Sequence, residues 1–221
     1  MNKEIKTVIF DMDGVLIDSE PVSWNVFKEF LKPYSKTMSL DQYAAGYSGK
    51  SEAANARRLI QEYQLDLDPK DFVEECIRLE DEQLSKGVLL KKGTLKVLDW
   101  LQSNGYKIAL ATSSETNRRK KLLKAHGIQD VFDAITDGSD FTHGKPDPEV
   151  FNLCVKKLNL KPKECLIIED SENGILAASA AKIPVILIPD LKIPEPDLLN
   201  KTTAVLESLD ELPSWLSDKN E

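Results

Sequence analysis

Two aspartates stand two residues apart near the start of the chain, in the stretch FDMDGVLIDSEP (10–21). Asp11 directly follows an apolar run, and Gly14, next after Asp13, allows the backbone to turn sharply. Like charges at this spacing disfavour each other's ionised form, and burial adds to that cost. A lone pair of this kind is most often an acidic turn, so chemistry here requires compensating groups elsewhere in the chain.

Other polar groups follow apolar runs further along the chain. In chain order they are Thr112, Ser113 and Ser114 after YKIALA, Lys145 in HGKPDPEVF, and Glu169, Asp170 and Ser171 after ECLII. In an open parallel sheet, ligands bind beyond the carboxyl ends of the strands. If the runs form one such sheet, carboxylates, hydroxyls and a lysine meet at a single edge.

This set of side chains suits a divalent cation with a phosphate group beside it. Mg²⁺ prefers oxygen ligands and keeps several waters, so a few carboxylates suffice, and the ion would relieve the repulsion between Asp11 and Asp170. Lys145 would add a positive charge beside the phosphate. Thr112 and Ser113, with neighbouring backbone N–H groups, would bind the phosphate oxygens.

The two aspartates near the start of the chain can be given separate roles. Asp11, at the end of an expected strand, is positioned to attack phosphorus and form an aspartyl-phosphate. Residues two apart in an extended segment point to the same side, so Asp13 is expected to face the same substrate. There it would protonate the leaving oxygen and later deprotonate the hydrolytic water.

Five short apolar runs are the expected strands that carry these groups. They cover residues 5–10, 106–112, 133–136, 164–170 and 184–189. Their nearly continuous apolar character is typical of parallel strands that are covered on both faces. Helical patterns over 93–105, 113–127 and 147–159 lie between them, and this alternation predicts an α/β fold with a doubly wound parallel sheet.

The segment from residue 18 to residue 87 interrupts the alternation with helical patterns alone. It is too long for an ordinary crossover between strands, so we expect a small all-helical domain inserted into the core. The predicted boundaries give a discontinuous core of residues 1–17 and 88–221 and an insert of residues 18–87. The tail beyond Leu209 is polar and is expected to fray.

The composition is that of a globular protein of 221 residues, with 41% hydrophobic and 30% charged residues. The net charge of -8 disfavours nucleic acid and anionic membrane surfaces as partners. No apolar stretch approaches the ~20 residues of a membrane span, and the N-terminus lacks the pattern of a secretory signal. The three scattered cysteines fit reduced thiols, so the expected location is cytoplasmic. The sequence leaves the oligomeric state open, and a monomer is compatible with it.

A run of four cations, Arg118 to Lys121, lies in the pattern over 113–127. We interpret it as the solvated face of a helix.

Four motifs together resemble the haloacid dehalogenase-like hydrolase superfamily, in the branch of beta-phosphoglucomutase and small-metabolite phosphatases. They are DMDGVLIDSEP, ALATSS, GKPDPEVF and IIEDSENGILAA, in this order along the chain. The resemblance implies a Rossmann-like core with Asp11 as nucleophile and Asp13 as general acid and base. It also implies that Thr112 and Lys145 bind phosphate.

The same resemblance implies a Mg²⁺ ion and a lid. The ion would be bound by the side chains of Asp11 and Asp170 and by the backbone carbonyl of Asp13. Glu169 would either bind the ion as well or contact one of its ligands. The inserted helices would be a mobile cap that closes over the site and excludes water. A loop of that insert, GYSGKS (46–51), offers Lys50 as a candidate substrate contact.

Three functions remain in competition. The first is a Mg²⁺-dependent phosphatase acting on a small phosphorylated metabolite such as a sugar phosphate. The second is a hexose-phosphate mutase, whose pattern carries a histidine where this chain has Ser23 and an arginine near Gly49, so both departures favour the hydrolase. The third is a non-catalytic binding or regulatory protein on the same fold, which the complete catalytic set disfavours.

Overall fold

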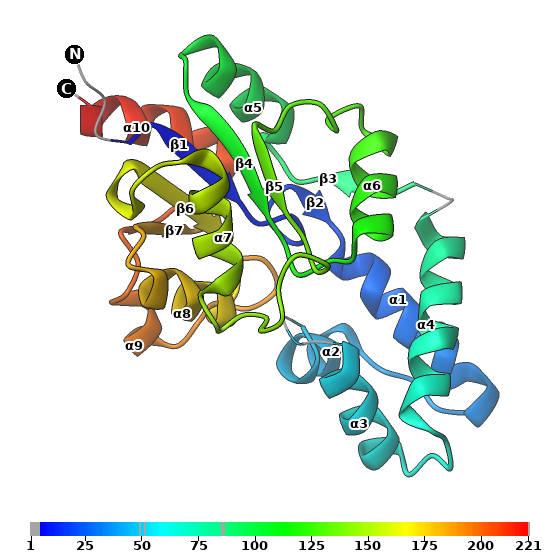
Figure 1. Ribbon diagram of the computed structural model, residues 1–221. Helices are drawn as coiled ribbons and strands as arrows, with labels where there is room; N and C mark the ends of the chain where they lie inside the picture. The colour runs from blue at the N-terminus through cyan, green and yellow to red at the C-terminus, as the bar shows by residue number, and fades with distance from the viewer. Residues whose placement is uncertain (1–4, 49, 51, 85–86, 221) are drawn as a thin grey trace. The chain divides into compact units, whose positions relative to one another are not determined.

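The computed structural model describes residues 5–48, 50, 52–84 and 87–220, and it divides the chain into two compact units (Figure 1). Unit 1 comprises Met1–Ile17 and Leu90–Glu221, and unit 2 comprises Asp18–Leu89. Unit 1 contains all the predicted site residues except Lys50.

Unit 1 is built on a parallel sheet in the strand order β5-β4-β1-β6-β7-β8. The strands are β1 (Thr7–Phe10), β4 (Lys107–Ala111), β5 (Ala134–Thr136), β6 (Cys165–Glu169), β7 (Val185–Leu187) and β8 (Ala204–Val205). The first five confirm the strands predicted from apolar runs, and β8 adds a short edge strand. Two further short strands, β2 (Ile17–Asp18) and β3 (Leu89–Leu90), pair with each other.

Helices cover the sheet of unit 1, which confirms the α/β class with a doubly wound sheet (Figure 1). They are α5 (Thr94–Ser103), α6 (Thr116–Ala125), α7 (Glu149–Leu158), α8 (Glu172–Ala181), α9 (Pro196–Leu199) and α10 (Leu212–Asn220). Phe151 of α7 and Ala178 of α8 pack with Ile9 and Ile167 of the central strands in one fully buried cluster. Burial of such side chains is the main stabilising contribution to the unit.

The prediction that the tail beyond Leu209 frays is wrong. A 3₁₀ turn (Leu209–Glu211) leads into α10, and Leu212 and Leu216 are fully buried. These two leucines lie one helical turn apart, so they form a narrow buried stripe on α10, and α10 packs against α5.

Both ends of α8 have a local physical cause. Ser171 is the N-cap, and its hydroxyl accepts a hydrogen bond from the Gly174 N–H at 3.0 Å. At the other end Lys182 adopts a left-handed conformation with φ 58° and ψ 37°. Glycine is the usual residue in that position, so Lys182 holds a strained backbone there.

Unit 2 is a bundle of helices around aromatic side chains. Its helices are α1 (Glu20–Leu31), α2 (Leu40–Gly46), α3 (Glu52–Tyr63) and α4 (Pro69–Leu84), and both α1 and α3 pack against α4. Phe27 makes edge-to-face contacts with Tyr43, Tyr47 and Phe72, with ring centroids 5.5–5.7 Å apart. The function of this unit as a cap stays a prediction.

Across the described part of the chain, the structure contains no helix that is both long and apolar enough to cross a membrane. The three cysteines are free thiols, and Cys154 and Cys165 are buried.

Candidate active site

Lys145 joins the first and fourth motifs in the interior of unit 1. Its ammonium donates to Asp11 Oδ1 at 2.5 Å and to Glu169 Oε1 at 2.6 Å. The three side chains are at most one-tenth exposed. Asp11 directly follows β1, and Glu169 is the last residue of the adjacent strand β6, where Phe10 is paired in register with Ile168. The sheet therefore brings Asp11, Lys145 and Glu169 together as the sequence predicted.

This cluster holds more negative charge than Lys145 can balance. Burial, reinforced by the nearby carboxylates Glu169 and Asp13, raises the pKa of Asp11 to about 7, although Lys145 opposes the rise. Burial alone would lower the pKa of Lys145, but Asp11 and Glu169 outweigh burial and raise it. The ammonium is thus fixed in its charged form, while Asp11 is left with a charge that a further cation would stabilise.

Glu169 is anchored on both oxygens by groups of the protein. Its Oε1 accepts from Lys145, and its Oε2 accepts from the N–H groups of Asp170 and Ser171 and from the Ser171 hydroxyl at 3.0–3.1 Å. Gly174 leaves the room for this carboxylate, because a Cβ there would lie 1.8 Å from Glu169 Cδ. Glu169 therefore holds Lys145 and the turn after β6, and its role as a metal ligand stays a prediction.

Asp13 contacts two side chains that the sequence did not pair with it. Its Oδ2 accepts from the Ser114 hydroxyl and from Arg118 Nη1, each at 2.7 Å. The interpretation of the run from Arg118 to Lys121 as a solvated face is therefore wrong for its first two members. Arg118 is 16% exposed beside Asp13, and Arg119 is 12% exposed and paired with Asp137.

The predicted phosphate ligands after β4 are placed differently from each other. Thr112 is buried, and its hydroxyl oxygen accepts from the Ser114 N–H at 3.0 Å, which leaves the hydroxyl hydrogen to be donated. Ser113 is exposed, and it is Ser114 whose hydroxyl reaches Asp13. Ser113 as a phosphate ligand stays a prediction, and the serine whose hydroxyl faces Asp13 is its neighbour Ser114.

The residues around Gly14 fit a divalent cation by the chemistry of their donors. Gly14 has φ +78°, and a Cβ on it would meet Asp170 Oδ2 at 2.2 Å and Asp190 Oδ2 at 3.2 Å. That Asp190 oxygen is buried and without a hydrogen-bond partner among the described residues, while its other oxygen pairs with Lys91 at 2.7 Å. Carboxylate oxygens are among the ligands that Mg²⁺ prefers in proteins.

Side chains alone do not complete a metal site. Within residues 5–48, 50, 52–84 and 87–220, no three His, Cys, Asp or Glu side chains are grouped so as to hold an ion. A cation here would rely on few carboxylates, Asp11 and Asp170, together with a backbone carbonyl such as that of Asp13. Mg²⁺ commonly binds proteins in this way, because it keeps several of its waters.

Lys50, the predicted substrate contact, belongs to unit 2. Its ammonium donates to the carbonyl of Gly46 at 2.6 Å, so the side chain folds back onto the end of α2. Gly49, which the comparison with mutases invoked, lies outside the described residues.

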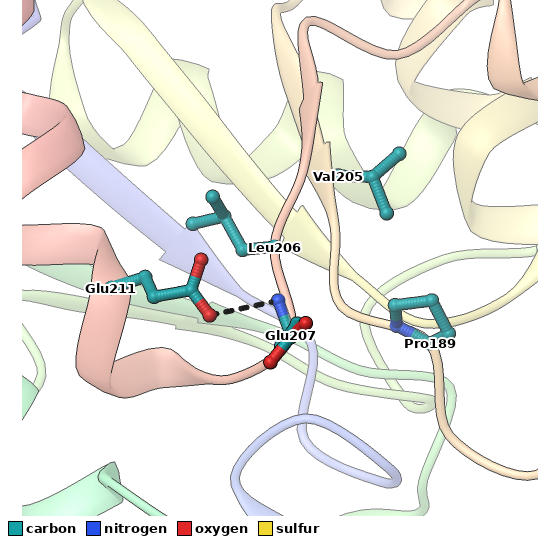
Figure 2. A pocket seen from close by; sticks show the side chains of 5 residues that line it. All are labelled: Pro189, Val205, Leu206, Glu207 and Glu211. Atoms are coloured by element: carbon teal, nitrogen blue, oxygen red, sulfur yellow. Dashed lines mark hydrogen bonds between the residues drawn. The ribbon is translucent and has the colours of Figure 1, made fainter.

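A separate depression of about 710 Å³ lies beside β7 and β8 (Figure 2). Figure 2 shows its lining residues, and the Glu207 N–H donates to Glu211 across it at 3.1 Å. The lining residues are Pro189, Val205, Leu206, Glu207 and Glu211. Among the described residues that line it, two carry carboxylates and none carries a positive charge, so this lining is unsuited to a phosphate group.

Comparisons with known proteins agree with this geometry. The model of the haloacid dehalogenase-like hydrolase family matches residues 8–188. The chain is 31% identical over 183 residues to a phosphorylated carbohydrates phosphatase from Thermotoga maritima, covering 81% of this chain and 82% of that protein. It is 29% identical over 219 residues to a bifunctional riboflavin kinase/FMN phosphatase from Arabidopsis thaliana, and spans 55% of the length of that relative and 99% of its own.

Among solved structures, the beta-phosphoglucomutase of Clostridium difficile superposes with a TM-score of 0.79 at 23% identity, covering 98% of this chain and 97% of that one. This likeness shows that the fold is shared. The family model matches most of the sequence, and the relative at 31% identity is a phosphatase. The chain therefore belongs to the haloacid dehalogenase-like hydrolase family and is a phosphoric monoester hydrolase.

Proposed function

We propose that this phosphatase hydrolyses a small phosphorylated metabolite, such as a sugar phosphate, through an aspartyl-phosphate on Asp11, with Mg²⁺ as cofactor. The observation that carries the proposal is Asp11 beyond the end of β1, buried and held by Lys145. The relative from Thermotoga maritima that acts on phosphorylated carbohydrates supports the substrate class.

The chemistry divides into two displacements at phosphorus. First, a carboxylate oxygen of Asp11 forms a bond to phosphorus while the bond to the ester oxygen breaks, and Asp13 gives that leaving oxygen its proton. Second, a water oxygen bonds to phosphorus, Asp13 takes the proton of the water, and the bond to Asp11 breaks. Phosphate leaves, and both aspartates return to their starting states.

Other residues of unit 1 would bind and orient the phosphoryl group. The Lys145 ammonium and the hydroxyl hydrogen of Thr112 would donate to its oxygens, with the exposed Ser113 turn beside them. Mg²⁺, held by Asp11, Asp170 and the carbonyl of Asp13, would neutralise charge on the phosphoryl group. Glu169 would keep Lys145 in place during both steps.

Unit 2 is assigned the role of a cap that selects small substrates. A helical lid that closes over a site admits small molecules and sequesters the reaction from water. Lys50 is the residue of this unit that we assign to substrate contact, with its ammonium leaving the Gly46 carbonyl when substrate binds.

A mutase is the second candidate, and one residue argues against it. The mutase pattern has a histidine at the position of Ser23, which is half-buried in α1. A hydroxyl there cannot carry a positive charge as an imidazole can. The hydrolase therefore remains the better proposal, and a silent binding protein on this fold is the remaining alternative.

One assay separates the three. Phosphate release from a panel of sugar phosphates is measured with Mg²⁺ and with a chelator, for the wild type and Asp11→Asn. The proposal expects Mg²⁺-dependent release that Asp11→Asn abolishes. An isomeric sugar phosphate without net phosphate release would indicate the mutase, and no turnover on a broad panel would favour the binding protein.

A further inference from the structure

We infer that Arg118, acting with Ser114, is a positioning residue for Asp13 in the phosphatase reaction. The inference rests on the proposed function, because it assigns Asp13 the proton transfers. It adds a residue of α6 that none of the four motifs contains.

Three side chains, those of Asp13, Ser114 and Arg118, contact one another. Arg118 Nη1 and Ser114 Oγ both donate to the same oxygen, Asp13 Oδ2, at 2.7 Å. Arg118 Nη1 also lies 2.5 Å from Ser114 Oγ. Charge-assisted hydrogen bonds of this kind are shorter and stronger than neutral ones, so they fix the carboxylate in direction as well as place.

The guanidinium is itself held in place by the protein. Its side chain is 16% exposed and so lies mostly out of water, although the run of cations in the sequence suggests a solvated helix face. The next residue, Arg119, donates to Asp137 at 2.8 Å, and Thr116 donates to the same carboxylate at 2.9 Å. These contacts hold the first turns of α6 in place, and with them the backbone of Arg118 from which its side chain extends.

Asp13 needs such support because it lies beyond β1, just before Gly14 with its φ of +78°. The ladder of the sheet therefore does not set the direction of its side chain. Proton transfer requires a carboxyl group fixed within hydrogen-bond reach of the leaving oxygen and then of the water.

The test uses p-nitrophenyl phosphate, whose leaving group departs without a proton from the enzyme. In Arg118→Gln the first displacement continues, but the second slows because Asp13 is misaligned toward water. We expect a burst of one p-nitrophenolate per active site, followed by a steady rate lowered about 10- to 100-fold. This is less than most of the roughly 10²–10⁴-fold that a general acid–base group contributes, because Asp13 is misaligned and not removed. Added methylguanidine is expected to restore part of the steady rate.

Lys120→Gln is the matched control, because it removes one positive charge from an exposed position of the same helix. It should keep the wild-type steady rate, show no new burst and not respond to methylguanidine. Arg118→Lys and Ser114→Ala should show the same burst with a smaller loss, and they decide the matter if Arg118→Gln does not fold.

Two results would overturn the inference. One is an Arg118→Gln steady rate within twofold of Lys120→Gln, and the other is an equal loss of burst amplitude and steady rate, which indicates a smaller fraction of folded enzyme. Failure of the proposed function looks different, since the wild type itself would then release no phosphate or would release it equally after Asp11→Asn.

Discussion

Lys145 and Asp11 form an ion pair in the interior of unit 1, with Nζ 2.5 Å from Oδ1 and both side chains at most one-tenth exposed. The two residues are far apart in sequence: Asp11 directly follows β1, and Lys145 lies in the loop between β5 and α7. The same ammonium also forms an ion pair with Glu169, so one cation lies between two buried carboxylates.

Replacing Lys145 by Met is expected to cost both stability and activity. The substitution leaves Asp11 and Glu169 buried side by side without a counter-charge, and breaking such a pair typically costs about 3–5 kcal/mol. Urea unfolding measures the loss. Lys157→Met is the control, because its pair with Asp140 is more than one-third exposed on both sides and should contribute at most about 1 kcal/mol. Equal losses in the two variants would contradict the account.

Replacing Gly174 by Ala should destabilise the protein although the residue lies in a helix. Alanine gains up to about 1 kcal/mol of helix propensity over glycine. A Cβ 1.8 Å from Glu169 Cδ requires the carboxylate to move, and overpacking of that kind costs about 1–3 kcal/mol before the contacts of Lys145 are counted.

Thermal unfolding and turnover check the Gly174 prediction together. Gly144→Ala is the control, since a Cβ there would meet only Phe141 at 3.8 Å. The prediction fails if Gly174→Ala is as stable and as active as Gly144→Ala.

Features that a local sequence pattern identifies could be predicted, whereas features that depend on contacts between distant residues could not. The strands and Lys145 were predictable because apolar runs and a specific motif identify them locally. Arg118 was not, because its partner Asp13 is 105 residues away and a run of cations looks the same whether paired or solvated. The helix after Leu209 was missed because its few apolar residues, of which only Leu212 and Leu216 are buried, give little periodicity.

The affinity for Mg²⁺ should depend on pH through Asp11. In the metal-free protein the pKa of Asp11 is raised to about 7, so below pH 7 the ion must displace a proton. The apparent dissociation constant should therefore rise about tenfold per pH unit on going down from pH 7 and level off above it. Calorimetric titration between about pH 5 and pH 8 would measure this change, because that range brackets the raised pKa of Asp11.

Asp11→Asn serves as the control for that titration. The amide cannot bind the proton, so Mg²⁺ should bind more weakly and without this slope. A slope that persists in Asp11→Asn would assign the competing proton to another group.

Replacing Lys182 by Gly should stabilise unit 1 and leave turnover unchanged. Lys182 ends α8 in a left-handed conformation that costs a side-chain-bearing residue about 1–2 kcal/mol, of which about 0.5–1 kcal/mol is offset by the greater freedom of glycine in the unfolded chain. The net gain should reach about 1 kcal/mol. Lys120→Gly, inside α6, should lower the free energy of unfolding by about that amount. The same substitution should therefore change stability in opposite directions at the two sites.

Phosphorylation of Asp11 is the central claim and can be observed directly. The enzyme is mixed with Mg²⁺ and a substrate in excess, quenched in acid during turnover, digested and mapped by mass spectrometry. The account predicts one added phosphoryl group on the peptide that contains Asp11, assigned to that residue by fragmentation and absent from Asp11→Asn. Rapid turnover with no phosphorylated peptide, or with the group on another residue, would contradict it.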